Sequence, residues 1–242
     1  MKPLIVANWK MNPLTGKDAV KLFESVKKGI RGAKKVEVII CPPFVYLPLL
    51  KGLVLGAQNV FYKENGAFTG EVSSSMLKDL NVKYVILGHS EVRKNLQETD
   101  EIINKKVKEV LIARLTPIIC VGEQESEDKP SILEQQVSGA LKSISAKDVK
   151  NVMIAYEPVW AIGNGKNCSI EETMGSLLLI RKIISKLYTK NLASHIKVIY
   201  GGSVDSKNAN FYINEAGANG LLVGGASLKP KEFTQIVKSV QQ

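Results

Sequence analysis

Short runs rich in Val, Ile and Leu recur along the whole chain and alternate with longer amphipathic segments. Eight such runs occur, at residues 3–7, 36–41, 53–57, 84–87, 117–121, 152–156, 196–200 and 221–223. In the segments between them the apolar residues follow the 3.6-residue period of a helix, as do Ala19, Leu22, Phe23 and Val26. Such regular alternation indicates parallel strands joined by crossover helices.

The number of strand–helix units sets the expected fold class. Eight units in 242 residues predict an α/β protein whose parallel strands close into an eight-stranded (β/α)8 barrel. An open, doubly wound sheet is the alternative arrangement of the same units. No Pro/Ser-rich linker or low-complexity tract interrupts the pattern, so residues 1–242 are expected to form a single domain.

The chain is basic, with 33 Lys and Arg residues against 23 Asp and Glu residues and a net charge of +10. Such a surplus is compatible with nucleic acid, an anionic membrane or a small anionic substrate. The lysines are scattered over the expected helices, and the 6% aromatic content leaves few rings for stacking on bases. No apolar run approaches the roughly 18 residues that span a bilayer, and the start lacks the pattern of a signal peptide. We therefore expect solvated basic faces, no nucleic-acid or membrane partner, and a cytoplasmic protein.

Cysteine and histidine spacing gives no sign of a metal site. Cys41, Cys120 and Cys168 are an odd number of widely spaced residues, so we expect free thiols and no disulfide framework. Neither CxxC nor HExxH occurs, and His89 and His195 are expected at opposite ends of the barrel. We expect no metal and no cofactor, and a structural role for His195.

In (β/α)8 barrels the chemistry takes place where strands end and the following loops begin. Glu157 ends the sixth apolar run and precedes a proline and a loop that contains Gly163 and Gly165. A carboxylate on a rigid strand beside a flexible loop has the layout of a base under a closable lid. An exposed Glu in an ordinary strand-to-helix connection is an equally good interpretation of this segment alone. The loop is no nucleotide-binding P-loop, because Trp160 stands where the first glycine of that motif belongs.

Further polar side chains follow strands at the same edge. His89 precedes an expected helix start, which disfavours a positive imidazolium, so we expect a neutral ring that donates a hydrogen bond or moves protons. Lys10 follows the first run, with Asn8 two residues earlier on the same side of the strand, and its ammonium would stabilise an oxyanion. The alternatives are that His89 only packs against or caps the helix and that Lys10 is an ordinary surface lysine. A Schiff-base role for Lys10 is the weaker hypothesis.

Glycine pairs follow the last two runs, Gly201-Gly202 before Ser203 and Gly224-Gly225. Backbone N–H groups after these strands form the phosphate site of many barrels. Glycine at this position also occurs in ordinary turns that bind nothing. A carboxylate base, a neutral imidazole, a cation and a phosphate cradle suit proton abstraction next to a carbonyl of a small phosphorylated substrate. The expected intermediate is an enediolate.

Eight segments carry a resemblance to a known family. They are residues 8–12 (NWKMN), 57–59 (AQN), 66–71 (GAFTGE), 88–91 (GHSE), 120–123 (CVGE), 155–165 (AYEPVWAIGNG), 200–204 (YGGSV) and 220–228 (GLLVGGASL). Through them the chain closely resembles the triosephosphate isomerase family over essentially its whole length. The resemblance implies a TIM barrel and a cofactor-free isomerase that interconverts dihydroxyacetone phosphate and D-glyceraldehyde 3-phosphate in glycolysis and gluconeogenesis.

The resemblance also implies a role for each matching residue. Glu157 would take the proton from carbon, and His89 would carry protons between the two substrate oxygens. Lys10 and Asn8 would bind and polarise the substrate. The remaining implied residues are Glu91, which would support the site, and Gly163, Ser203, Gly224 and Gly225, which would bind phosphate through their N–H groups.

The family is usually a homodimer. The loop around Phe68-Thr69-Gly70 is implied to insert beside Lys10 and His89 of the other subunit, so Thr69 is expected to support the neighbouring site. The implied partners are therefore a phosphorylated triose and a second copy of the chain.

Three positions depart from the family pattern. Val92 precedes Arg93 where the family commonly has two arginines, which removes a charged contact expected near Glu71 of the other subunit. Asn164 stands where the lid usually has Thr, and Cys168 stands where the far hinge commonly has Ala. These changes concern the strength of the dimer and the rate of lid closure.

Two other functions are carried as alternatives. A barrel lyase or aldolase acting on sugar phosphates would share the glycine cradle but would use a Schiff-base lysine or metal ligands. An additional, non-enzymatic role would use the basic surface to bind a partner.

Overall fold

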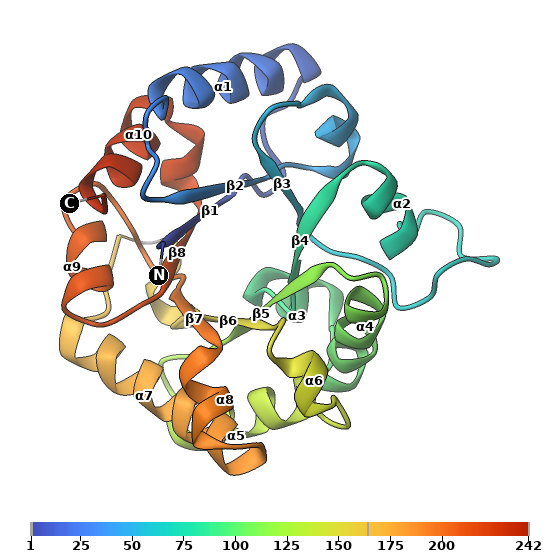
Figure 1. Ribbon diagram of the computed structural model, residues 1–242, viewed down its shortest axis with the longest axis vertical. Coiled ribbons are helices and arrows are strands. Elements are labelled where there is room, and N and C mark those ends of the chain that lie inside the picture. The colour runs from blue at the N-terminus through green and yellow to red at the C-terminus, as the bar shows by residue number, and fades with distance from the viewer. Residues whose placement is uncertain (1, 164, 242) are drawn as a thin grey trace.

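The eight apolar runs form eight parallel strands that close into a barrel in chain order, β1 to β8, as predicted (Figure 1). The computed structural model describes residues 2–163 and 165–241. The strands are β1 (Leu4–Asn8), β2 (Glu37–Cys41), β3 (Val54–Ala57), β4 (Val82–Leu87), β5 (Thr116–Val121), β6 (Met153–Tyr156), β7 (Lys197–Tyr200) and β8 (Gly220–Val223). Pairing of β1 with both β2 and β8 closes the sheet, so the open doubly wound alternative is wrong.

Successive residues of each strand face opposite sides, and both sides are buried. In β1, Leu4 and Val6 belong to the cluster inside the barrel, whereas Ile5 and Ala7 pack outward against the helices. A strand that is buried on both faces needs apolar residues without alternation, which is why these segments appear in the sequence as continuous Val/Ile/Leu runs.

A ring of helices covers the outside of the barrel (Figure 1). The α-helices are α1 (Gly16–Gly29), α2 (Ser74–Asp79), α3 (Ser90–Leu96), α4 (Asp100–Ile112), α5 (Lys129–Ala140), α6 (Ala146–Val149), α7 (Ile170–Leu187), α8 (Lys190–His195), α9 (Ala209–Asn214) and α10 (Pro230–Ser239). Short 3-10 turns are η1 (Phe44–Leu49), η2 (Val159–Ala161) and η3 (Gly225–Leu228). The predicted stripe of Ala19, Leu22, Phe23 and Val26 is the buried face of α1. The Thr15 hydroxyl accepts from Asp18 N–H and so caps this helix.

Strand ends differ from the expected runs by one or two residues, because the ladder of a neighbouring strand decides where pairing stops. β4 begins at Val82, two residues before the apolar run, since Val82 pairs with Leu55 across an irregular register next to Gly56. β1 extends to Asn8, which pairs with Cys41. The polar residue Asn8 is therefore fixed by the sheet itself.

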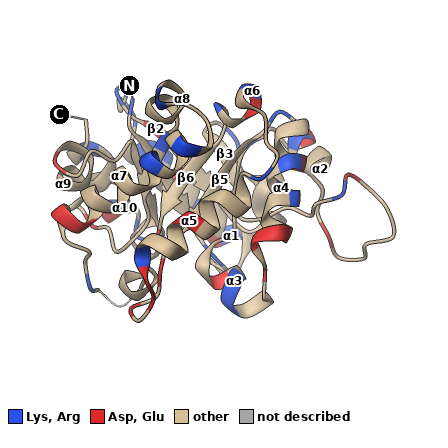
Figure 2. Ribbon diagram, turned by 90° about the horizontal axis from the view of Figure 1, so that it is seen from below, with Lys and Arg blue, Asp and Glu red and all other residues tan. Residues whose placement is uncertain are grey.

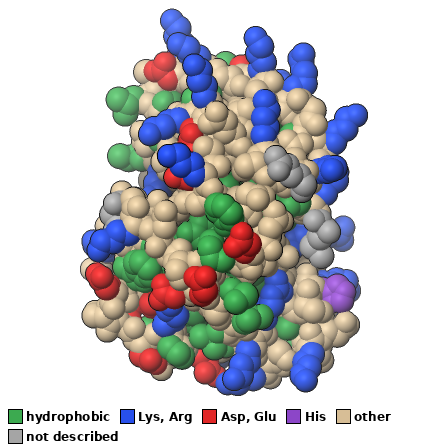
Figure 3. Space-filling model, turned by 90° about the vertical axis from the view of Figure 1, so that its left-hand side faces the viewer, with side chains coloured by type: hydrophobic (Ala, Val, Ile, Leu, Met, Phe, Trp, Pro, Cys, Tyr) green, Lys and Arg blue, Asp and Glu red, His purple; other side chains and the backbone are tan. Residues whose placement is uncertain are grey.

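Charged side chains lie on most outer elements. Lys and Arg are distributed over many helices and loops in Figure 2, and basic side chains project around the outline of the face shown in Figure 3. Within residues 2–163 and 165–241, none of the helices has the length and apolar character required to cross a membrane.

Candidate active site

The polar residues that follow the strands meet around one cavity at the carboxyl end of the barrel. The cavity has a volume of about 250 Å³. Its lining includes the predicted residues Asn8, Lys10, His89, Glu157, Gly163, Ser203, Gly224 and Gly225. They come from loops spread over the whole chain, and parallel strands in a closed barrel bring these loops to the same rim.

Glu157 is held at the end of β6 and is almost fully buried. Its N–H donates to the carbonyl of Val121 over 2.8 Å, which continues the ladder between β5 and β6. A Cβ atom at Gly122 would lie 1.8 Å from the carbonyl oxygen of Glu157. A Cβ atom at Gly201 would lie 2.8 Å from the Cγ atom of Glu157. Glycine is therefore required on both sides, and the carboxylate has a fixed position.

The Glu157 carboxylate points toward His89. The Oε1 atom lies 3.3 Å from Nε2 of His89, and Oε2 makes no hydrogen bond to any described residue. Cys120 lies beside the carboxylate; burial raises the pKa of this thiol, and the charge of Glu157 raises it further. A buried carboxylate oxygen without a partner is unusual in proteins and suits an atom that receives a proton.

His89 is the N-cap residue of α3. Its Nδ1 atom accepts a hydrogen bond of 3.2 Å from the N–H of Glu91. A ring nitrogen that accepts carries no proton, so this contact places the ring proton on Nε2, which faces the cavity. The same contact is the capping contact that was the alternative interpretation of His89, and the predicted role of its ring in proton transfer stays a prediction.

Lys10 lies beyond the end of β1 with a positive φ of 54°, in the left-handed region that residues with a Cβ rarely adopt. Its N–H donates to Oδ1 of Asn8 over 3.1 Å, and Gln58 Nε2 donates to its carbonyl over 2.8 Å. These bonds hold the strained backbone, so the turn and not the strand alternation directs the side chain into the cavity. The sequence assigned no role to Gln58, although it stands in the segment AQN.

The Lys10 ammonium pairs with Glu91, whose Oε1 atom lies 2.5 Å from Nζ. The other carboxylate oxygen of Glu91 is 3.8 Å from Nδ1 of His89. Glu91 therefore contacts both predicted polar groups. Its side chain is half exposed in the single chain.

Glycines form the opposite wall of the cavity. Gly163 and Gly165 have φ values of 74° and 76°, which any other residue would adopt only with strain. Gly224 and Gly225 follow β8, and a Cβ at Gly225 would meet no atom within 4 Å. Open backbone N–H groups of this kind approach an anion closely. Lys229 also lines this cavity and was missed, because nothing distinguishes it in sequence from the many surface lysines.

The sequence profile of the family described as triosephosphate isomerase matches residues 3–240. The chain belongs to the triosephosphate isomerase family.

Relatives in this family are similar along their whole length. A triosephosphate isomerase from Alkaliphilus oremlandii (strain OhILAs) is 43% identical over 246 residues, which cover 98% of this chain and 98% of that protein. The triosephosphate isomerases of Caldanaerobacter subterraneus subsp. tengcongensis and Thermoanaerobacter pseudethanolicus are 45% and 44% identical with the same coverage.

Thr69 lies away from the cavity of its own chain. It belongs to the exposed loop between β3 and α2, which projects from the barrel (Figure 1). The rings of Phe61 and Phe68 pack against each other in this loop at a tilt of 47°, with 4.7 Å between their centroids, and Phe68 stays partly exposed.

The arginine that the chain shares with the family pattern is used inside the subunit. Arg93 Nε donates to the carbonyl of Gly88 over 2.8 Å, and its Nη1 atom lies 2.6 Å from Oδ1 of Asp100. Arg93 therefore fixes the turn that carries His89 within its own chain. Val92, half-buried on α3, adds no charge beside it.

Glu123 holds the first part of the loop that is predicted to be a lid. Val159 N–H donates to the carbonyl of Glu123 over 2.9 Å, and Trp160 Nε1 donates to its carboxylate over 3.1 Å. Asn164 lies outside the described residues. Cys168, at the far end of this loop, is buried.

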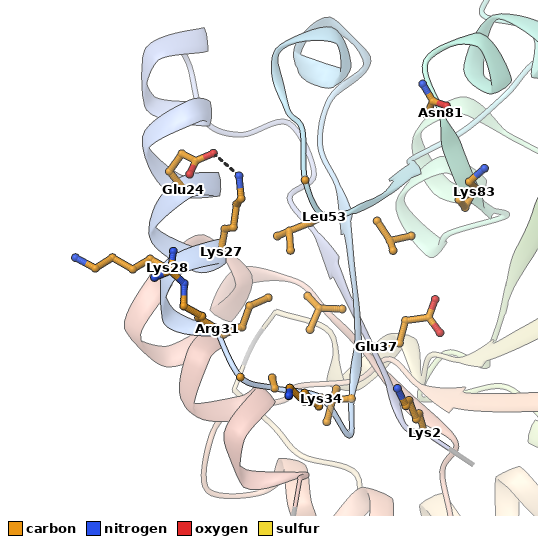
Figure 4. Close-up of a pocket in the computed structure, with 17 residues that line it drawn as sticks. Lys2, Glu24, Lys27, Lys28, Arg31, Lys34, Glu37, Leu53, Asn81 and Lys83 are labelled. Carbon is orange, nitrogen blue, oxygen red and sulfur yellow. Dashed lines mark hydrogen bonds and ion pairs between the residues drawn. The ribbon is translucent and has the colours of Figure 1, made fainter.

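A larger groove, of about 1210 Å³, lies at the opposite end of the barrel (Figure 4). Its lining includes residues before or at the start of strands, such as Lys2 before β1 and Asn81 before β4, together with residues of α1. Its acidic residues already have partners, because Glu24 pairs with Lys27 within the groove and Glu37 accepts from the Tyr84 hydroxyl. None of the described residues that line this groove is a histidine, so we assign the chemistry to the smaller cavity.

His195 also lies at the end of the barrel opposite the cavity. It ends α8, two residues before β7 begins at Lys197, and its Nδ1 atom lies 2.6 Å from the carbonyl oxygen of Asn191. This contact is local to α8, and the structural role of His195 stays a prediction.

No group of three or more His, Cys, Asp or Glu side chains in the described part of the chain is arranged to hold a metal ion.

Proposed function

We propose that the chain interconverts dihydroxyacetone phosphate and D-glyceraldehyde 3-phosphate by proton transfer through an enediolate, with Glu157 as the base. Membership of the triosephosphate isomerase family makes the chain an isomerase, and the relatives carry that name. The single observation that carries the mechanism is the distance of 3.3 Å between Glu157 Oε1 and His89 Nε2, both in the cavity.

The two groups divide the proton transfers between carbon and oxygen. Glu157 removes the proton from the carbon next to the carbonyl, using the buried carboxylate that has one oxygen without a partner among the described residues. His89 donates its Nε2 proton to a substrate oxygen and takes one from the neighbouring oxygen. Use of a neutral imidazole in this way is the established pattern of the triosephosphate isomerase family.

Lys10 stabilises the negative charge that develops on oxygen. Its ammonium is fixed by Glu91 at 2.5 Å and by the strained turn, so it needs little reorganisation during the reaction. Asn8, buried at the end of β1, orients the Lys10 backbone and supplies an amide to the substrate.

The phosphate of the substrate would bind the glycine wall. The N–H groups of Gly163, Ser203, Gly224 and Gly225 belong to residues that line one part of the cavity, and backbone N–H groups bind phosphate without a side-chain charge. Closure of the lid that contains Gly163 would then exclude water from the enediolate.

The working form would be a homodimer. The projecting loop with Phe68, Thr69 and Gly70 is exposed in the single chain, and Met11 and Leu14 beside Lys10 are 87% and 89% exposed. Apolar side chains this exposed support an interface that buries them. Thr69 would then support Lys10 of the other subunit.

The family activity belongs to glycolysis and gluconeogenesis, and we propose the cytoplasm as the location. The lyase or aldolase alternative is disfavoured by one contact. A Schiff base would require Nζ of Lys10 to attack a carbonyl, whereas this atom is paired with the carboxylate of Glu91 at 2.5 Å.

A coupled assay of the purified protein with each triose phosphate tests the function. Glu157→Gln should lower turnover by about 10²- to 10⁴-fold, the usual contribution of a general base. Glu171→Gln, exposed on α7, is the control and should keep full turnover. Borohydride treatment with substrate should trap no adduct on Lys10. An inactive wild type, or a trapped adduct, would contradict the proposal.

A further inference from the structure

The groove at the end of the barrel opposite Glu157 is more basic than the chain as a whole. Six Lys or Arg residues and two Glu residues line it, whereas the whole chain has 33 basic and 23 acidic residues. Both glutamates already have partners, Lys27 for Glu24 and the Tyr84 hydroxyl for Glu37. Most of the positive charge in this basic groove is therefore not compensated by its own lining.

The remaining cations come from separate elements and are exposed to solvent. They are Lys2, Lys28, Arg31, Lys34 and Lys83. Lys28 lies on α1, and Arg31 and Lys34 lie in the turn that follows it. Lys83 lies across the groove on β4 (Figure 4). The ion pairs formed between described residues include none of these five side chains, so all five remain able to bind an external anion.

Apolar side chains form the floor of the basic groove. Ile30, Val36 and Val38 line it and are buried, with 7–8% of each side chain exposed. Leu53 and Val54 are half-buried. All of them are less exposed than the cations, and Leu53 lies between α1 and Lys83 in Figure 4. The groove thus combines apolar contact area at depth with positive charge at its rim.

One wall of the groove is fixed by Lys27. Its Nζ atom lies 3.3 Å from Oε1 of Glu24 and donates to the carbonyl of Lys51 over 3.2 Å. Gly52 follows with a φ of 97°, and a Cβ atom there would lie 2.9 Å from the same Nζ atom. The segment before β3 is therefore tied closely to α1. A surface that is formed in advance loses less conformational entropy when it binds a partner.

The size and the chemistry of the basic groove limit its occupant. Its volume of about 1210 Å³ exceeds the roughly 300–1,000 Å³ of small-molecule sites. The described lining contains no aromatic ring on which a nucleic-acid base could stack. The barrel is closed, so a bound peptide cannot add a strand to a free edge and must be recognised through its side chains. Carboxylates complement the rim, and apolar side chains complement the floor.

We propose that the basic groove is a docking site for an acidic peptide segment of a partner protein, with apolar side chains on the floor and carboxylates on the rim cations. This inference goes beyond the proposed isomerase function and does not depend on it. A partner bound at this end of the barrel leaves the cavity around Glu157 open to substrate.

The first test measures binding of a fluorescein-labelled peptide that repeats Glu-Leu-Glu-Asp-Val, by anisotropy with the whole chain. We expect saturable binding that weakens as NaCl is added, because salt screens exposed charges. A peptide with Gln and Asn in place of Glu and Asp should lose binding, and one with Ser in place of Leu and Val should bind more weakly. No saturable binding below about 1 mM peptide would overturn the proposal.

Charge-reversal variants test whether the groove is the place of binding. Arg31→Glu combined with Lys34→Glu should weaken binding roughly tenfold, since two exposed ion pairs are lost and two like charges are added. Lys182→Glu combined with Lys190→Glu is the matched control, with the same change in net charge. These two lysines are exposed on α7 and α8, across the barrel from α1, and should leave binding unchanged (Figure 1). Equal weakening in both proteins would mean general attraction to a basic surface and would overturn the docking site.

A milder variant covers the case in which charge reversal disturbs the fold. Arg31→Gln combined with Lys34→Gln removes the two charges and adds none, and it should weaken binding roughly threefold. Melting temperatures of all variants report whether they are folded. A folded neutral variant that binds as tightly as the wild type would contradict a role for this rim.

Zero-length cross-linking of the peptide with a carbodiimide, followed by mass spectrometry, locates the bound carboxylates directly. Cross-links should concentrate on Lys28, Lys34 and Lys83. An even distribution over the exposed lysines of the chain would overturn the proposal.

Two further measurements separate the peptide from other occupants and from the isomerase function. A single-stranded oligonucleotide should bind more weakly than the peptide, and tighter binding of the oligonucleotide would overturn the choice of a peptide. Saturating peptide should leave isomerase activity unchanged, whereas competitive inhibition would place the peptide in the cavity around Glu157 and contradict docking in the groove. A chain that lacks isomerase activity but binds the peptide through Arg31 and Lys34 would contradict the proposed function alone.

Discussion

The backbone N–H of Glu91 donates a hydrogen bond to Nδ1 of His89 over 3.2 Å. The same contact caps the first turn of α3 and assigns the imidazole proton to Nε2, the nitrogen that lies 3.3 Å from Glu157. Helix formation therefore selects the tautomer that the chemistry needs.

Glu157→Asp should keep the fold and lose about 10²-fold in turnover. The shorter side chain withdraws the carboxylate by about one bond length, and a misplacement of this size can cost that factor. Binding of a substrate analogue, measured by calorimetry, should change far less than turnover. Wild-type turnover in this variant would remove Glu157 from the role of base.

Shortening the lid across residues 162–164 should cause loss of phosphate as a side reaction. The deletion removes the Gly163 N–H from the cavity and leaves the enediolate open to water. Inorganic phosphate released per turnover is the measurement. If isomerisation persists with no additional phosphate, this loop is not a functional lid.

Val92→Arg should strengthen the proposed homodimer. Arg93 is already committed to Gly88 and Asp100 within the subunit, so position 92 is the place from which an arginine would reach Glu71 of the other subunit. A charge-assisted hydrogen bond contributes about 1.5 to 3 kcal/mol, less if it is exposed and screened. Specific activity of the wild type should fall on dilution, and the variant should shift this fall to lower concentration. Sedimentation of both proteins is the companion measurement; a wild type fully active as a monomer contradicts the prediction.

The three thiols should be unreactive in the folded protein. Burial raises the pKa of Cys41, Cys120 and Cys168, and the thiolate is the form that reacts. At pH 8, Ellman's reagent should modify them only after unfolding. Because the folded pKa values lie above the unfolded value of about 8.5, stability from these groups is complete below that pH and declines as the pH rises above it. Cys168→Ala should leave two thiols in the unfolded titration, and fast modification of the native protein would disprove the burial argument.

Glu98→Gln should destabilise the fold by about 3 kcal/mol, because removing one charge leaves Lys106 buried without compensation. Glu98 and Lys106 form a buried ion pair on side chains that are 5% and 7% exposed, and Lys106 also donates to Oδ1 of Asn59. Urea unfolding at fixed protein concentration measures the loss. Glu101→Gln, which breaks an exposed pair with Lys105, is the control and should have no measurable effect; equal changes in both would contradict the argument.

The order of strands and helices was predictable because it depends on local patterns. Apolar runs such as residues 36–41 reflect burial on both faces, and the stripe on α1 reflects contact with the barrel along one face. The ends of strands were less predictable. The start of β4 at Val82 depends on its partner Leu55 in another strand, which the local sequence does not contain.

The location of the candidate site was also predictable, since parallel strands bring their carboxyl ends to one rim wherever they occur in the chain. Asn8, His89 and Glu157 could be selected for this reason alone. Gln58 could not be selected in this way, because its side chain donates to the backbone carbonyl of Lys10 in a neighbouring loop. Thr69 was selected through the family resemblance, and it does not line the cavity of its own chain.

The barrel, its helices and the residue types at the rim follow from the order of residues alone, because periodicity and strand ends are properties of neighbours in the chain. How the rim groups pair depends on the folded molecule. The contact of Lys10 with Glu91 joins residues 81 positions apart, and that of Tyr212 with Cys168 joins residues 44 apart. Such distances are set by barrel closure and side-chain packing, in which the position of each group depends on the register of all eight strands.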